Sequence, residues 1–229
     1  MIGVFDSGVG GFNAVYELRR LLPYADILYL ADRDNAPYGT KTREELVSLV
    51  HRDVTRLCER GADRILMACC TASTVYAMLS DDARRICVPI IEPAARATLG
   101  ADTAVIATDA TVRSHAFSDE IRRIYKDARV CEIAAQRLVC EVERGARTGC
   151  LTEEQSRYLD SLCSEVARTE CSALVLGCTH FSHLEGEIHA RLPALNVISP
   201  AREGARALAR DHEVNNAERV RECLRTVYM

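Results

Sequence analysis

The feature that most constrains the fold of this chain is a regular alternation of short apolar runs with amphipathic segments. The apolar runs end in small or polar residues, which is typical of strands buried on both faces of a sheet. Two amphipathic segments begin with capping-box pairs, Thr42 with Glu45 and Thr152 with Gln155. Strands that alternate with helices predict an α/β fold with mostly parallel sheets.

The predicted strands span residues 2–5, 27–30, 64–68, 88–91, 103–107, 173–176 and 197–198. The alternation breaks near Ile91 and again near Pro200, so we expect two Rossmann-like α/β lobes. The N-terminal lobe comprises residues 1–92 together with 200–229, where two closing helices return to it. The C-terminal lobe comprises residues 93–199.

The composition excludes several classes of function. The 29 basic and 33 acidic residues give a net charge of −4, which provides no broad basic surface for nucleic acid. The apolar runs are too short to span a bilayer, and the first residues lack the basic and apolar regions of a signal peptide. We therefore predict a cytoplasmic protein with no nucleic-acid or membrane partner.

Cysteine is unusually frequent, with 11 residues. The Cys-x-x-Cys spacing of structural zinc sites is absent, so we predict no metal. We interpret seven cysteines as small buried apolar residues: Cys58, Cys87, Cys131, Cys140, Cys163, Cys171 and Cys223. Cys69 and Cys178 differ, because each follows an apolar strand with a Thr shortly after it.

The two matched thiols suggest a specific chemistry. Ligands of open α/β sheets bind beyond the carboxyl ends of the strands, where Asp6, Cys69, Thr111 and Cys178 are expected. Two facing lobes would place one thiol on each wall of the cleft between them. A following helix would stabilise each thiolate. One thiol could then remove a proton from a stereocentre while the other returns one to the opposite face, which is two-base racemisation.

Other polar groups can assist this reaction. Asp6 is in sequence reach, and His180 can orient Cys178 or exchange its proton. The N–H groups of the glycine turn and several hydroxyls can stabilise charge on a substrate carboxylate: Ser7, Thr71 and Thr179. The glycine turn is not a dinucleotide loop, because Asn13 stands where the fingerprint requires glycine, so we predict no nucleotide cofactor there.

Five motifs resemble those of glutamate racemases, in the same order and at compatible spacing: Val4–Gly11, Pro37–Lys41, Ala68–Ser73, Ile91–Pro93 and Leu176–His180. Residues 108–114 resemble the family's linking segment into the second lobe, so the resemblance runs from residue 2 to about residue 200. It implies a two-domain α/β enzyme that interconverts L- and D-glutamate with neither pyridoxal phosphate nor metal. It also implies supply of D-glutamate for peptidoglycan, and hence for cell shape, and a homodimer.

The resemblance also assigns roles to residues. Cys69 and Cys178 would be the catalytic acid/bases, the first acting on D-glutamate and the second on L-glutamate, and Asp6 and His180 would assist them. The remaining matched positions would line the substrate pocket: Ser7, Pro37, Tyr38, Gly39, Cys70, Thr71, Thr111 and Thr179.

The chain departs from the family at two informative places. Cys70 stands where the family has Asn, as either an inert packing residue or a pocket residue that alters specificity. Residues 134–136 read Ala-Ala-Gln where the family usually reads Ala-Cys-Pro. Two alternatives therefore stay open: a racemase or isomerase of another small carboxylate, such as aspartate, and a non-catalytic relative that binds a small acid or a protein.

Overall fold

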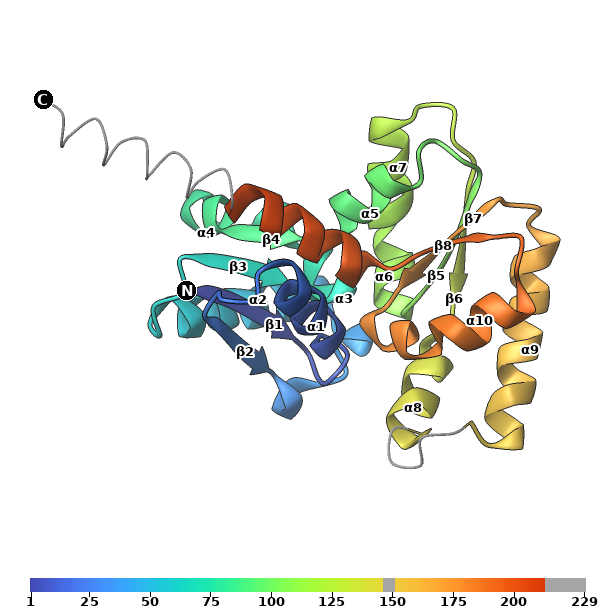
Figure 1. Ribbon diagram of the computed structural model, residues 1–229, viewed down its shortest axis with the longest axis horizontal. Coiled ribbons are helices and arrows are strands. Elements are labelled where there is room, and N and C mark those ends of the chain that lie inside the picture. Colours follow the sequence, from blue (N-terminus) through green and yellow to red (C-terminus); the bar gives the residue numbers. More distant parts are fainter. Residues whose placement is uncertain (146–150, 213–229) are drawn as a thin grey trace, which may run out of the picture.

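A computed structural model of the chain describes residues 1–145 and 151–212. It contains two four-stranded sheets flanked by helices, and Figure 1 shows them side by side. All strand pairs are parallel, so the predicted α/β class is confirmed. The strand orders are β2-β1-β3-β4 and β6-β5-β7-β8, so the second sheet repeats the topology of the first.

The elements of the first sheet and its helices are β1 (Ile2–Asp6), α1 (Phe12–Leu21), β2 (Ile27–Ala31), η1 (Arg33–Asn35), η2 (Tyr38–Thr40), α2 (Arg43–Cys58), β3 (Arg64–Met67), α3 (Cys70–Ser73), η3 (Tyr76–Met78), α4 (Asp81–Ile86) and β4 (Cys87–Pro89). Those that follow are α5 (Ile91–Ala97), β5 (Thr103–Ala107), α6 (Asp109–Ser114), α7 (Ala116–Ile124), β6 (Val130–Ala134), α8 (Gln136–Gly145), α9 (Glu153–Arg168), β7 (Ala173–Gly177), η4 (Thr179–Leu184), α10 (Glu185–Arg191) and β8 (Asn196–Ile198).

The sequence patterns located most of these elements. Both predicted capping boxes are present, at the starts of α2 and α9. The predicted strand at 88–91 was too long, because β4 ends at Pro89 and Ile91 already begins α5. Strand β6 was missed. It is an edge strand that is only partly buried, so it tolerates Glu132 and lacks a continuous apolar run.

Apolar packing holds the two sheets together. Strands β1, β5 and β7 are buried along their whole length. One core cluster contains Val4 and Leu66 from the first sheet and Val105 and Val175 from the second. Such a shared core is stabilised by about 25 cal/mol for each Å² of apolar surface that is buried. The carboxyl ends of the central strands are thereby fixed relative to one another.

Residues 200–212 form a helix that crosses the first lobe, drawn in red in Figure 1. Gly204 lies so close to Ile90 and Leu66 that a Cβ atom there would meet their side chains. Arg64 and Asp211 form an ion pair between this helix and β3. The second predicted closing helix lies outside the described residues, and the division into lobes at residues 92 and 200 stays a prediction.

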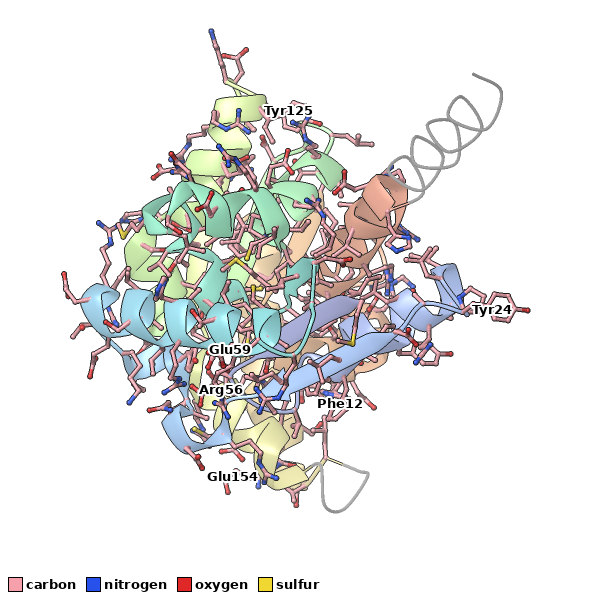
Figure 2. The ribbon with its side chains drawn as sticks, turned by 90° about the vertical axis from the view of Figure 1, so that its left-hand side faces the viewer. Phe12, Tyr24, Arg56, Glu59, Tyr125 and Glu154 are labelled. Atoms are coloured by element: carbon pink, nitrogen blue, oxygen red, sulfur yellow. The ribbon has the colours of Figure 1, made fainter. Side chains whose placement is uncertain are left out.

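In the described part of the chain no helix is long and apolar enough to cross a membrane. Large exposed apolar side chains gather on α1 and just after it, and Phe12 and Tyr24 are labelled at the periphery of Figure 2. Tyr24 is 98% exposed. The homodimer stays a prediction.

Candidate active site

The two predicted thiols follow equivalent strands. Cys69 lies just beyond β3 and Cys178 directly after β7, each the third strand in the order of its sheet. Both line one cavity of about 10 Å³, which is room for a single water molecule. The other lining residues come from both halves of the chain: Ser7, Pro37, Tyr38, Gly39, Cys70, Thr71, Thr108, Gln136, Val139, Thr179 and His180.

Cys69 caps the one-turn helix α3. Its Sγ accepts a hydrogen bond from the N–H of Ala72 at 3.5 Å and donates to Oγ of Ser7 at 3.8 Å. Burial and the negative charge of Asp6 nevertheless raise the pKa of Cys69 to about 12. The N–H of Ala72 lowers this pKa, in the direction predicted for a thiol at a helix start, but the loss of solvation outweighs it.

Cys178 has a different partner. Its Sγ lies 3.7 Å from Nδ1 of the buried His180, two residues further along the chain. Cys178 begins the 3₁₀ helix η4, and no backbone N–H of that helix caps its side chain. One thiol is thus held by a hydroxyl and a backbone amide, and the other by an imidazole.

Asp6 joins the two halves of the site although it does not line the cavity. This fully buried carboxylate accepts the N–H of Gly8 at 2.8 Å and the hydroxyl of Thr179 at 3.0 Å. Burial raises the pKa of Asp6, while the charge of His180 and these hydrogen bonds lower it. Gly10 permits the close approach, because a Cβ atom there would collide with the side chain of Thr179.

Three threonine hydroxyls form a second link between the halves. Oγ1 of Thr71, after β3, lies 3.0 Å from Oγ1 of Thr108 and 3.1 Å from Oγ1 of Thr111, which both follow β5. Thr108 and Thr111 are 2.9 Å apart. Thr111, which we predicted to line the pocket, instead lies one hydrogen bond behind the wall, where it is fully buried.

Tyr38 contributes its ring to the wall and directs its hydroxyl away into a buried network. The hydroxyl lies 2.6 Å from Asp32 and 2.8 Å from Asp53, and Arg52 contacts both carboxylates at 2.5 and 3.0 Å. Burial raises the pKa of Asp53, while the hydrogen bonds from Tyr38 and Arg52 and the charge of Arg52 lower it. The network holds the segment that ends in Gly39 against the cavity.

The sequence analysis missed three members of the wall: Thr108, Gln136 and Val139. Thr108 lay within the recognised linking segment, but only its neighbour Thr111 was selected. Gln136 and Val139 lie on one face of α8, and their only signal was the departure from Ala-Cys-Pro. Cys70 belongs to the shared core cluster and also lines the cavity, and its effect on specificity stays a prediction.

The other cysteines vary in burial. Cys87, Cys163 and Cys171 are buried as predicted, whereas Cys58 and Cys140 are exposed and Cys131 is half-buried. The prediction was wrong for Cys58, Cys131 and Cys140, because the apolar or helical surroundings of a small side chain do not determine whether it is buried. Cys223 lies outside the described residues. No group of three His, Cys, Asp or Glu side chains within residues 1–145 and 151–212 is arranged to hold a metal ion.

The sequence profile of the Asp/Glu/Hydantoin racemase family matches residues 16–208. The chain belongs to this family, and so to the amino-acid racemases, a class of isomerase. The resemblance drawn from the five motifs is thereby confirmed at the level of the family. An enzyme, rather than a non-catalytic binding protein, is the class that the fold and the family define.

Among curated relatives, the chain is similar to glutamate racemase of Desulforudis audaxviator, with 36% identity over 92% of this chain and 78% of the relative. It is 34% identical to glutamate racemase of Limosilactobacillus reuteri, over 90% of this chain and 78% of the relative. The solved glutamate racemase of Francisella tularensis, in complex with D-glutamate, gives a TM-score of 0.86 at 28% identity over 94% and 81% of the two chains.

An aspartate racemase of Picrophilus torridus is more distant. It gives a TM-score of 0.64 at 19% identity, over 92% of this chain and 93% of that one. This likeness shows a common fold alone.

Proposed function

We propose that the protein interconverts L- and D-glutamate by a two-base mechanism in which the thiols of Cys69 and Cys178 transfer the protons. The observation that carries this proposal is the placement of two buried thiols after equivalent strands of two sheets, on the wall of one cavity. A pair of acid/base groups flanking one stereocentre is the arrangement that racemisation requires.

With D-glutamate, the thiolate of Cys69 takes the α-proton and the S–H of Cys178 gives a proton to the opposite face. The cycle leaves a thiol at position 69 and a thiolate at position 178, which is the state that acts on L-glutamate. The hydroxyl of Ser7, which accepts from Cys69 and keeps its own proton, is suited to stabilise negative charge that spreads onto the α-carboxylate. Neither pyridoxal phosphate nor a metal enters the proposed steps.

The raised pKa of Cys69 suggests how the substrate activates its own base. With a pKa of about 12, Cys69 is a thiol at neutral pH in the free protein. The negative charge of Asp6 contributes to that pKa, second to burial. A substrate ammonium group beside Asp6 would neutralise this charge and stabilise the thiolate. The base would then be formed only when an amino acid is bound.

The names of the similar proteins support glutamate as the substrate, and the solved relatives from Francisella tularensis and Escherichia coli are complexes with D- and L-glutamate. We further propose that the product D-glutamate serves peptidoglycan synthesis in the cytoplasm. Expression of the gene in a bacterium that requires external D-glutamate tests this role: growth without D-glutamate supports it, and continued dependence contradicts it.

Aspartate is the second candidate substrate, and Cys70 is the observation that favours testing it. A thiol is a weaker hydrogen-bond donor than the amide that the family carries at this position. Loss of that amide alters how the wall binds a carboxylate. Racemisation of aspartate faster than glutamate by the same preparation would select this alternative.

The deciding experiment follows the circular dichroism of L- and D-glutamate with the reduced protein and its variants. We expect the signal of both enantiomers to decay to zero with the wild type. Cys69→Ser and Cys178→Ser should each lower the rate by about 10³-fold, because each removes one acid/base group. Cys163→Ser, which replaces a buried thiol in α9 away from the cavity, is the matched control. Full activity in either cavity variant contradicts the two-thiol mechanism.

A further inference from the structure

Most polar side chains in the cavity wall already use their hydrogen-bonding groups within the protein. Thr71 and Thr108 bond to each other, and Thr179 donates to Asp6. Gln136 differs from them. Its amide nitrogen and amide oxygen are both buried, and neither has a hydrogen-bond partner among the described residues. Gln136 is the first residue of α8 and lines the cavity together with both thiols.

A buried amide without partners is costly, so nearly all such groups in native proteins bond to protein, water or a ligand. The amide of Gln136 offers two N–H donors and one carbonyl acceptor. The donors suit a carboxylate. The group carries no charge, so it does not compete with the carboxylate of Asp6 for an ammonium group.

The position of Gln136 separates it from the amino-group end of the site. Its Oε1 lies against the Cα of Gly39, so closely that a Cβ atom there would collide with it. Thr108 is the other neighbour of Gly39. Asp6, by contrast, contacts Gly8 and Thr179, in the part of the site nearest His180. The polar contacts thus form two groups, one around Asp6 and one around Gly39.

We propose that Gln136 donates a hydrogen bond to the side-chain carboxylate of the acidic substrate and is a specificity-determining residue of this enzyme. An amino acid whose ammonium group lies on the side of the cavity nearest Asp6 and whose α-carbon lies between the thiols extends its side chain toward the amide of Gln136. The inference rests on the proposed racemisation of an acidic amino acid.

The test compares two substitutions of Gln136. Gln136→Leu removes the hydrogen-bonding groups at similar volume, and Gln136→Glu sets a second carboxylate against that of the substrate. We measure kcat and KM for both enantiomers of glutamate, and by calorimetry the Kd of glutamate and of 2-aminobutyrate, which lacks the side-chain carboxylate. Arg137→Leu, at the exposed neighbouring position of α8, is the control for disturbance of the helix start.

We expect Gln136→Leu to raise KM and Kd for glutamate about tenfold, as loss of one hydrogen bond to a charged group predicts. Gln136→Glu should raise them further, while kcat and the Kd of 2-aminobutyrate stay near the wild-type values. An unchanged or lower KM in Gln136→Leu would show that the amide only fills space, and equal weakening of both ligands would show a general disturbance. Either result overturns the inference.

The outcome is separable from that of the proposed function. A wild type that binds but does not racemise glutamate contradicts the proposed function, while the calorimetric comparison of glutamate with 2-aminobutyrate still decides the role of Gln136. A wild type that racemises glutamate with the same KM as Gln136→Leu contradicts the role of Gln136 alone.

Discussion

The two lobes share a strand order and differ in what surrounds their thiols. In the first lobe Cys69 follows β3 and is bonded by Ser7 and a backbone N–H, near the buried Asp6. In the second lobe Cys178 follows β7 and is paired with His180. The repeated topology therefore fixes where each thiol lies, and the loops around it decide its protonation chemistry.

Among the groups that surround the thiols, the largest effect should come from Asp6, because this carboxylate contacts residues of both lobes. We expect Asp6→Asn to lower kcat/KM by about 10²-fold or more, since it removes the proposed partner of the substrate ammonium group and weakens the bond from Thr179. The substitution also removes a negative charge that helps raise the pKa of Cys69. That pKa should fall, so the ascending limb of kcat/KM against pH should move to lower pH.

A pH profile measured by circular dichroism from about pH 8 to 12 checks this sign, because kcat/KM reports the pKa values of the free enzyme and this range reaches the raised pKa of Cys69. A limb that stays in place, or moves to higher pH, would contradict the coupling between Asp6 and Cys69. Asp63→Asn, which replaces an exposed carboxylate paired with the N-terminus, provides the matched control.

An intermediate effect separates the two thiol partners. We expect His180→Asn to lower kcat/KM by about 10²-fold and Ser7→Ala by roughly tenfold, because an imidazole can exchange a proton and a hydroxyl only orients one. The equilibrium constant of racemisation is one, so kcat/KM must stay equal for the two enantiomers in every variant. A substitution that slows proton transfer at one thiol must therefore be detected by primary isotope effects, which can differ between the two enantiomers.

In His180→Asn the isotope effect with α-deuterated L-glutamate should rise and that with α-deuterated D-glutamate should fall, because transfer to Cys178 becomes slower. In Ser7→Ala the isotope effect with α-deuterated D-glutamate should rise and that with α-deuterated L-glutamate should fall, because transfer to Cys69 becomes slower. His183→Asn, which changes an exposed histidine on the same segment, should leave both isotope effects unchanged. The same isotope effects in His180→Asn and Ser7→Ala would contradict the assignment of Ser7 to Cys69 and of His180 to Cys178.

The smallest effect concerns the hydroxyl link between the lobes. Thr111→Val removes two hydrogen bonds while Thr71 and Thr108 remain bonded to each other. We expect the free energy of unfolding to fall by about 1–2 kcal/mol and Tm by roughly 2–4 °C per kcal/mol. Thr103→Val, whose hydroxyl bonds within the second lobe, is the control in thermal unfolding. KM should rise in Thr111→Val alone, and an equal rise in both would contradict a positioning role for this link.

The sequence by itself determined the fold class and most of the elements, and it indicated the two thiols that the structure brings to one cavity. Buried parallel strands are continuous apolar runs, and capping boxes mark helix starts within a few residues, so local chemistry was sufficient for both. The site residues that follow strands directly could be proposed for the same reason, because every parallel strand ends at the same edge of its sheet. The partly exposed β6 had no such run, and it was missed.

Only the tertiary structure decided which polar groups meet across the lobes and how their protons are held. The contacts of Asp6 with Thr179 and of Thr71 with Thr111 join residues 173 and 40 positions apart, which no local pattern specifies. Gln136 enters the wall because its amide lies against Gly39 of η2, a contact between residues far apart in the sequence. The raised pKa of Cys69 likewise depends on burial, which overrides the helix position that the sequence indicated. Solvation and long-range contacts are properties of the assembled core, and for that reason they appear only once the chain is folded.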